Sequence, residues 1–208
     1  MVKQERALRT REALITSAAT VFDREGFSVA SLTAISSLAG VSNGALHFHF
    51  SSKATLADSV EEAAGERLDR IVMAHEGAAG NALQLLVNTS HGLARGLTED
   101  VVLRAGFELS RDQVRGRGPG LYRQWHRWVE EVLKRADGEG VLAEVTPEDA
   151  AASVVAATTG FEVLGPQNPE WLSHRTVTRF WQLLLPRLAD ASVLGTLVAA
   201  GSRPEGRP

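Results

Sequence analysis

Two histidines in a short, glycine-containing segment are the residues best suited to do chemistry. The segment Ala39–Phe50, AGVSNGALHFHF, contains His47 and His49. Imidazole can bind a metal ion, transfer a proton or donate a hydrogen bond to a phosphate. Helical residues two positions apart lie about 200° apart around the axis, so this pair cannot hold one ion, which needs a spacing of four. The segment therefore favours contact with another molecule over a metal site.

Composition argues against several other kinds of site. The 208 residues include no cysteine, which excludes disulfides, thiolate catalysis and cysteine-based zinc sites. A small-molecule hydrolase is an alternative, with Ser36, Ser37, His47, His49 and His91 as its candidate residues. The sequence has no nucleophile elbow and no phosphate loop after a strand, which argues against it. We therefore expect a protein that is not an enzyme and that uses no cofactor or metal. The chain has no apolar run of membrane-spanning or signal-peptide length, so we expect a cytoplasmic protein without a membrane partner.

Charge is distributed unevenly along the chain. The net charge is −3, yet basic residues outnumber acidic ones over residues 1–56, and the reverse holds for the remainder. A basic N-terminal part on an acidic body is an asymmetry that matters for binding nucleic acid.

Helical periodicity dominates the chain and must position these residues. Leu14, Ala18 and Phe22 repeat every four residues, and Gly26 follows where a helix commonly ends. The same reasoning predicts helices at about 8–25, 32–38, 43–48, 52–75, 81–97, 99–111, 121–136, 147–164 and 170–188. Only Val141–Val145 alternates briefly, as a strand would. We therefore expect an all-α protein, with a disordered tail at 201–208.

Two of the short helices have the spacing of a helix-turn-helix. Ser31 can cap the helix at 32–38, and Ser42 can cap the helix that follows it. Between them, Gly40 supplies an unusual backbone angle and Val41 fills the gap between the helices. In such a motif the second helix enters the major groove of DNA with its N-terminus first.

The residues at that N-terminus suit contact with DNA. Asn43 can pair with an adenine edge, small residues let the backbone approach closely, and His47 can donate to a phosphate. Basic residues around the motif can contact phosphates as well. The DNA-binding set that we predict is Lys3, Arg6, Arg9, Ser31, Ser42, Asn43, Gly44, Ala45, His47, His49 and Lys53. We expect Phe48 and Phe50 to fill the core.

Residues 8–60 resemble the N-terminal signature of TetR-type transcriptional repressors. The resemblance rests on Thr10, Arg11, Gly26-Phe27, Ala39-Gly40-Val41-Ser42, Gly44, Phe48-His49-Phe50 and Lys53. His47 stands where the family usually has a tyrosine that contacts a phosphate. The resemblance implies a three-helix DNA-binding domain at 1–52 and a ligand-binding and dimerisation domain at 53–200. It also implies a repressor that binds a double-stranded DNA operator as a homodimer.

The remaining chain resembles the γ-butyrolactone receptor branch of this family. GALHFHF followed by a lysine, VVLRAGFEL at 101–109 and Trp125 after a glycine-rich loop carry the resemblance. It implies an apolar pocket for a small effector, with Trp125 at the ligand, and control of antibiotic biosynthesis. Some members carry a glutamine in the long fourth helix, where this chain has Glu62–Gly65 without one, so a pseudo-receptor that responds to antibiotics or their intermediates is an alternative. A helical adaptor that kept the fold without binding DNA is another.

The C-terminal helices have the composition of such a pocket. Trp125 and Trp128 lie three positions apart, and Thr158 and Thr159 offer hydroxyls within an apolar run. The ligand-binding set that we predict is Leu85, Val102, Leu103, Phe107, Trp125, Trp128, Thr158, Thr159, Phe161 and Val163. Each can instead be ordinary core, and a threonine can bond its own helix backbone. We expect the last two helices, including Ala150 and the stripe from Phe180 to Leu188, to form the dimer interface as a four-helix bundle.

Overall fold

Helices make up the fold throughout residues 2–77, 80–111 and 120–202, which the computed structural model describes, with side chains from Gln4 onward. They are α1 (Val2–Val29), α2 (Leu32–Leu38), α3 (Asn43–His49), α4 (Lys53–Glu76), α5 (Ala82–Glu99), α6 (Val101–Arg111), α7 (Leu121–Gly138), α8 (Pro147–Leu164), the 3-10 helix η2 (Pro169–Leu172), α9 (His174–Leu188) and α10 (Ala191–Leu194). In these ranges the alternating segment near Val141 gives only one isolated bridge, between Leu142 and Ala189, and no strand. The all-α prediction is confirmed.

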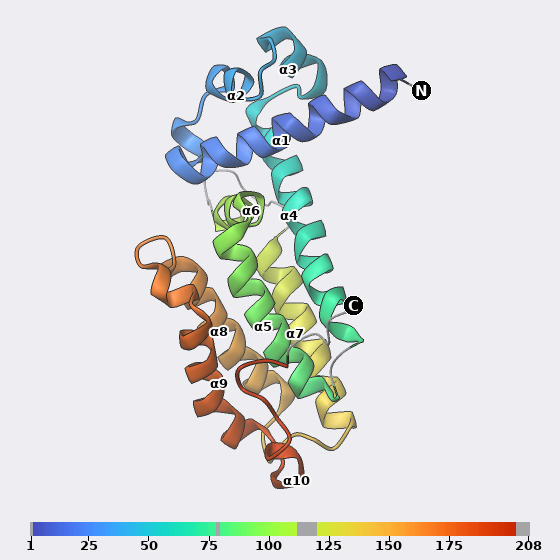
Figure 1. The fold of residues 1–208 in the computed structure, drawn as a ribbon, viewed down its shortest axis with the longest axis vertical. Helices are drawn as coiled ribbons and strands as arrows, with labels where there is room; N and C mark the ends of the chain where they lie inside the picture. The colour runs from blue at the N-terminus through green and yellow to red at the C-terminus, as the bar shows by residue number, and fades with distance from the viewer. Residues whose placement is uncertain (1, 78–79, 112–119, 203–208) are drawn as a thin grey trace. The chain divides into compact units, whose positions relative to one another are not determined.

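The helices, labelled in Figure 1, group into two compact units. The first unit comprises residues 1–67 and 100–121, and so contains α1 to α3, most of α4 and α6. The second comprises 68–99 and 122–208, with the end of α4, α5 and α7 to α10. The first unit includes the predicted domain at 1–52 and adds α6, which is distant in sequence.

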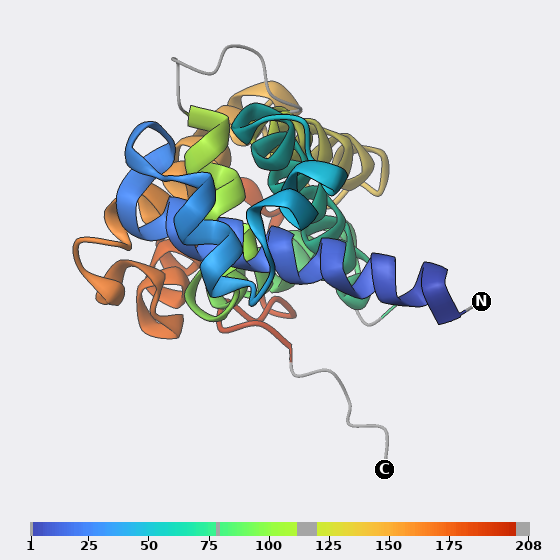
Figure 2. The same ribbon diagram turned by 90° about the horizontal axis from the view of Figure 1, so that it is seen from above.

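Helix α1 buries a stripe of apolar side chains in the first unit. Leu14, Ala18 and Phe22, the four-residue repeat, are all exposed by 1% or less. The helix begins at Val2, earlier than predicted, and its N-terminal end extends past α2 and α3 (Figures 1 and 2). At Gly26, with φ 75°, the helix kinks and continues to Val29. Glycine adopts that angle without steric cost, which explains its position there.

Close packing and two ion pairs hold α6 within the first unit. A Cβ on Gly106 would lie 2.2 Å from the Cβ of Ala64 on α4, so only glycine permits this approach. Arg104 Nη2 lies 3.1 Å from Asp23 Oδ2 on α1. Arg67 Nε lies 2.6 Å from Oδ2 of Asp100, whose other oxygen accepts from the first amides of α6. Helix α6 is therefore part of the N-terminal unit.

The second unit is built around α5, which is buried along nearly its whole length. Helix α7 contributes Trp125, Val129 and Leu133 to this core, and α9 contributes Trp181 and Leu185. Each of these large side chains stabilises the fold by about 1.5–3 kcal/mol through burial.

The C-terminal segment 198–202 runs along α5. Gln84 forms two hydrogen bonds with the backbone of Val198, at 3.2 and 2.8 Å. Asn88 donates to Ser202 Oγ at 2.7 Å and accepts from its backbone N–H at 2.9 Å. Gly201 and Ser202, which we expected to begin a disordered tail, therefore have defined positions. Residues 203–208 of that tail, like most of the glycine-rich loop at 112–119, lie outside the described residues.

Candidate DNA-binding surface and ligand sites

The helix-turn-helix forms as the sequence predicts. Ser31 and Ser42 each accept a hydrogen bond at 3.1 Å from the backbone N–H three residues further on. Gly40, between the two helices, has a φ of 67°, and Val41 is half-buried. The serines satisfy amides that a helix start leaves open. These local contacts fix the direction of α3.

The N-terminal end of α3 is exposed, as a groove-entering helix requires. Asn43, Gly44 and His47 are exposed and Ala45 is half-buried. A Cβ on Gly44 would meet only Ser42 Oγ, at the ordinary contact distance of 3.9 Å. The fold itself therefore does not require glycine at position 44. The structure brings these four predicted residues together on one short helix, with Asn43, Gly44 and Ala45 in its first turn and His47 in its last.

Phe48 is not a core residue, contrary to prediction. Its side chain is 83% exposed, whereas Leu46 is fully buried and Phe50 is 4% exposed. A helical residue two positions after a buried one lies about 200° away from it, so Leu46 and Phe48 face opposite directions. Phe50, placed just after α3 ends, takes the core position. Helix α3 therefore exposes an apolar ring next to the predicted DNA-binding residues.

His47 and His49 have separate surroundings. His47 is exposed, but His49 is half-buried, with ring centroids 5.3 Å from Phe48 and 6.4 Å from Phe50. Within the part of the chain that the structure describes, no group of three histidine, cysteine or acidic residues is placed to hold a metal ion.

Lys53 has an internal role that the sequence did not predict. Its Nζ donates to the carbonyl oxygens of Phe27, Ser28 and Ala30, at 2.7, 3.1 and 2.8 Å. The ammonium also lies 4.8 Å from the centre of the Phe27 ring. An ammonium has three N–H donors, so all three are used. Lys53 ties the start of α4 to the α1–α2 connection and has no donor left for the predicted phosphate contact.

The basic residues near the N-terminus lie on α1 itself, which begins before the predicted start at about residue 8. Arg6 and Arg9 are exposed on α1, while the side chain of Lys3 lies outside the described residues. Arg11, to which the sequence assigned no role, donates from Nη2 to Ser59 Oγ at 3.1 Å. Its guanidinium lies 5.5 Å from the centre of the Phe50 ring. Arg11 therefore ties α1 to α4.

The predicted ligand-binding residues fall into both units. Val102, Leu103 and Phe107 are buried in the first. The second holds the others, which are Leu85, Trp125, Trp128, Thr158, Thr159, Phe161 and Val163. Their role at an effector site stays a prediction.

Trp125 and its hydrogen-bonding partner are central to the set in the second unit. Trp125 is 1% exposed, and its Nε1 donates to Thr158 Oγ1 at 2.8 Å. Thr158 donates in turn to the carbonyl of Val154 at 2.9 Å. The Trp125 ring stacks on Trp128, with centroids 5.0 Å apart. Thr158 is thus committed to the fold, whereas Thr159 is half-buried and has no hydrogen bond within the described residues.

Phe161 and Val163 lie toward the surface of α8. Val163 is 37% exposed. Phe161 is half-buried and packs edge-on against Phe180 of α9, with centroids 5.6 Å apart. A buried carboxylate that the sequence did not single out, Glu162, accepts from the Tyr122 hydroxyl and links α8 to α7.

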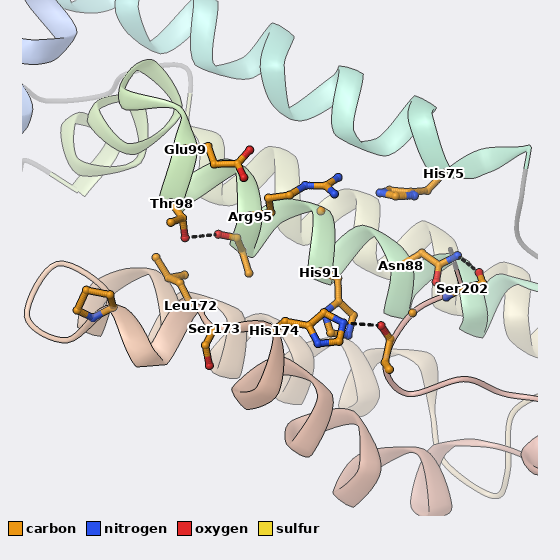
Figure 3. Close-up of a pocket in the computed structure, with 15 residues that line it drawn as sticks. His75, Asn88, His91, Arg95, Thr98, Glu99, Leu172, Ser173, His174 and Ser202 are labelled. Carbon is orange, nitrogen blue, oxygen red and sulfur yellow. Dashed lines mark hydrogen bonds between the residues drawn. The ribbon is translucent and has the colours of Figure 1, made fainter. Parts of the chain in front are cut away.

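A cavity of about 610 Å³ lies within the second unit, between the end of α4, α5, the η2–α9 region and residues 200–202 (Figure 3). None of the predicted ligand-binding residues lines it. Its polar lining includes His75, Asn88, His91, Arg95, Glu99 and His174. Sequence reasoning named His91 but did not place these residues at one site, because they come from three helices that meet only through packing.

Two histidines of this cavity have depressed pKa values. Burial lowers the pKa of His75 below its ordinary value of 6.5, and the neighbouring charge of Arg95 lowers it further. Burial also lowers the pKa of His91; the bond to the Ala199 carbonyl opposes this, and the charges of His174 and His75 add to the lowering. Both imidazoles are therefore mostly neutral near pH 7.

Comparison with known proteins agrees with the geometry of the first unit. The family described as "Bacterial regulatory proteins, tetR family" matches residues 14–60, from the core of α1 into α4. The A-factor receptor protein of Streptomyces griseus is 30% identical over 209 residues, covering 100% of this chain and 72% of that protein. The chain belongs to the TetR family of bacterial regulatory proteins.

Other relatives also match over most of the chain. TtgR, a helix-turn-helix transcriptional regulator of Pseudomonas putida, is 27% identical over 168 residues, covering 76% of this chain and 80% of TtgR. An ArpA-like γ-butyrolactone receptor superposes with a TM-score of 0.79 at 25% identity, over 93% of this chain and 95% of that one. CprB of Streptomyces coelicolor, solved in complex with its operator sequence, has a TM-score of 0.77 at 28% identity, over 93% and 94% of the two chains.

The chain is therefore a TetR-family transcriptional regulator that resembles γ-butyrolactone receptors over its whole length, as its motifs predict. The relatives named above are described as regulators and receptors. No helix in the described ranges is long and apolar enough to cross a membrane.

Proposed function

We propose that this TetR-family regulator is a homodimeric repressor that binds a palindromic operator through α3 and leaves it when a small apolar effector binds. The observation that carries the proposal is the exposed N-terminal end of α3, held by the caps of Ser31 and Ser42 and the turn at Gly40. The operator complex of its structural relative CprB supports the choice of DNA as partner.

The DNA contacts follow from the chemistry of α3. Asn43 pairs with a base edge and His47 donates to a phosphate, while Gly44 and Ala45 let the backbone approach the groove. The open space around Gly44 supports this assignment, because a missing side chain that the fold does not need can serve a partner. Two protomers would place their α3 helices in half-sites about 34–36 Å apart.

The proposed effector site is centred on Trp125. Trp125, Trp128 and Leu85 supply apolar walls, and Thr159 supplies a polar anchor because Thr158 is already engaged. Apolar walls with a few placed polar atoms are typical of ligand sites. Since the solved relatives include γ-butyrolactone receptors, we assign a γ-butyrolactone-type signal or an antibiotic as effector, and antibiotic biosynthesis genes as targets.

Release requires that the effector binds more tightly to a state that no longer fits the operator. A difference of about 1–3 kcal/mol is the usual size of such coupling. Helix α4 runs unbroken from Lys53 in the first unit to Glu76 in the second. A displacement of α4 would pass through Lys53 directly to the connection between α1 and α2.

Helices α8 and α9 are the proposed dimer interface. Leu183 is 80% exposed and Val163 is 37% exposed, with Phe180 half-buried beside them in the same helices. Ala150 and Leu188, from the predicted interface, are instead buried within the protomer. The exposed apolar residues would pair with the same two helices of a second protomer in a four-helix bundle.

A pseudo-receptor of the same fold is the second candidate, and the segment Glu62–Gly65 favours it. Glu62 is exposed, and Ala64 is buried against Gly106. The segment therefore provides no buried polar side chain that could bind a lactone. Such a protein would respond to antibiotics or their intermediates and not to butyrolactones.

Fluorescence anisotropy on the DNA upstream of the protein's own gene tests both candidates. The complex is titrated with a synthetic γ-butyrolactone and then with an antibiotic-like polyketide. Release by the lactone supports the receptor, and release by the polyketide alone supports the pseudo-receptor. Equal operator affinity with every effector would rule out the release mechanism. Asn43→Ala should weaken operator binding, whereas Glu131→Ala, an exposed change on α7, should not.

A further inference from the structure

The cavity between α4, α5 and α9 contains polar groups that the proposed effector site does not use. We propose that it is a second ligand site, for a small molecule with an apolar body and a single carboxylate, which Arg95 and His75 bind. The cavity lies wholly within the second unit and shares no residue with the set around Trp125.

On one side of the cavity, the polar side chains bind the C-terminal segment. Asn88 uses both atoms of its amide on Ser202. The Nε2 atoms of His91 and His174 lie 3.0 and 2.9 Å from backbone carbonyl oxygens of the same segment. A carbonyl can only accept, so each ring must donate its Nε2 proton there. These side chains form a fixed wall and leave the opposite side to bind a ligand.

The opposite side carries positive or titratable groups without partners. His75 is only 8% exposed, yet neither of its ring nitrogens has a hydrogen-bonding partner among the described residues. Arg95 likewise has no ion pair or hydrogen bond within that part of the chain. Figure 3 shows the guanidinium and the ring pointing toward one another. An anion that accepts from both would satisfy the buried imidazole and neutralise the arginine.

The position of His75 depends on a missing side chain in α5. A Cβ on Gly92 would lie 2.8 Å from His75 Nε2 and 2.9 Å from Ile71 Cγ2, which is closer than such atoms approach. Only glycine at position 92 therefore allows the ring to lie against α5 at the cavity wall. The packing of α5 does not require a histidine at this place, so the position of the His75 ring is consistent with a role in binding a ligand.

The remaining walls select the ligand class. Ala94, Pro169 and Leu172 present an apolar surface, and about 610 Å³ is within the range of small-molecule sites. Glu99 lies one helical turn beyond Arg95 and also lines the cavity. Its carboxylate repels a second negative charge, so a monoanionic carboxylate fits better than a phosphate ester. The chemistry points to an apolar carboxylic acid.

Full-length protein and the probe 2-naphthoate test this site, with the neutral 2-naphthamide as matched control. Calorimetry gives the affinities, and the ring C–H signals of the six histidines locate the ligand by NMR. We expect naphthoate to bind, to shift the His75 signal and to raise the pKa of His75. We expect naphthamide to bind about tenfold more weakly, because it lacks the charge that Arg95 recognises.

Two substitutions separate this site from other binding. Arg95→Gln should weaken the binding of naphthoate about tenfold. Arg127→Gln, a change to an exposed arginine on α7, should leave the affinity for naphthoate unchanged. Gly92→Ala should displace the His75 ring and should also lower the affinity for naphthoate. Equal binding of acid and amide, an unmoved His75 signal, or full affinity in Arg95→Gln would overturn the proposal. None of these measurements uses DNA, so their outcome is independent of the repressor assignment.

Discussion

The indole N–H of Trp125 donates to the hydroxyl oxygen of Thr158 at 2.8 Å, and both side chains are buried. The Thr158 hydroxyl in turn donates a hydrogen bond to the carbonyl of Val154 in the preceding turn of α8. This chain of bonds joins α7 to α8 at the centre of the proposed effector site. Thr158, which the sequence predicts at the ligand site, therefore also links two helices of the fold.

Thr158→Val should lower the free energy of unfolding by about 1–3 kcal/mol, because the indole N–H loses its acceptor while it stays buried. Thr159→Val is the matched control, since that hydroxyl is half-buried and outside the tie; its effect should stay within about 0.5 kcal/mol. Urea unfolding followed by tryptophan fluorescence measures both. Equal values for the two variants would show that the bond contributes nothing.

Two glycines of the helix-turn-helix should respond differently to alanine. Gly40→Ala should destabilise the fold by about 1–2 kcal/mol, because a φ of 67° strains a residue with a Cβ. Gly44→Ala should preserve stability, since its Cβ would meet one atom at 3.9 Å, but it should weaken operator binding. Thermal unfolding and anisotropy separate the two effects. Undiminished operator affinity in Gly44→Ala would contradict the close approach of this backbone to DNA.

Lys53→Met should reduce stability and operator affinity without changing how affinity depends on salt. The Lys53 ammonium donates to three backbone carbonyls, so its removal loosens the α1–α2 connection. Because these donors contact no phosphate, the number of counterions released on DNA binding stays the same. Arg9→Gln should instead reduce the slope of log affinity against log salt by about 1 per protomer, because we predict a phosphate contact for this exposed residue. Anisotropy over a salt series distinguishes them. A smaller slope in Lys53→Met would return this residue to the DNA interface.

Phe48 and Phe50 should differ sharply in their effect on stability. Phe50→Ala should cost about 3–5 kcal/mol, because the ring is 4% exposed. Phe48→Ala should change the free energy of unfolding by less than about 0.5 kcal/mol, because that ring is 83% exposed. Chemical denaturation of the two variants provides the comparison, and a large loss in Phe48→Ala would show that the ring is covered in solution.

Stability should decrease as pH falls from about 7 to 5. The folded pKa values of His75 and His91 lie below 6.5, so the unfolded chain takes up protons first as the solution is acidified. The stabilisation is complete above 6.5 and is lost as pH falls through the folded values. His91→Gln should flatten this dependence, since an amide still donates to the Ala199 carbonyl but does not titrate.

The helix-turn-helix could be predicted because its chemistry is local. Ser31, Ser42 and Gly40 act on residues within a few positions, so cap and turn rules are sufficient. Phe48 and Lys53 could not be assigned in this way. What each side chain touches depends on helices elsewhere in the chain, and one residue of helical rotation decides between core and surface.

The cavity was beyond sequence reasoning for the same physical reason. Hydrophobic period tells which face of α5 is buried, but not which polar groups of α4 and α9 meet it. His75, His91 and His174 are far apart in sequence and converge only through packing. A glycine in mid-helix, Gly92, is the one local sign, since such a glycine often marks a close approach.

Helix α6 limits how this protein can be dissected. Gly106 rests on Ala64, and Arg104 pairs with Asp23 of α1, so the N-terminal unit is assembled from two stretches of chain. A truncation at residue 52 or 67 would strip away α6 and expose the apolar side of α1 to water. Such a fragment would tend to aggregate. A minimal DNA-binding fragment must therefore carry residues 100–111 on an engineered linker.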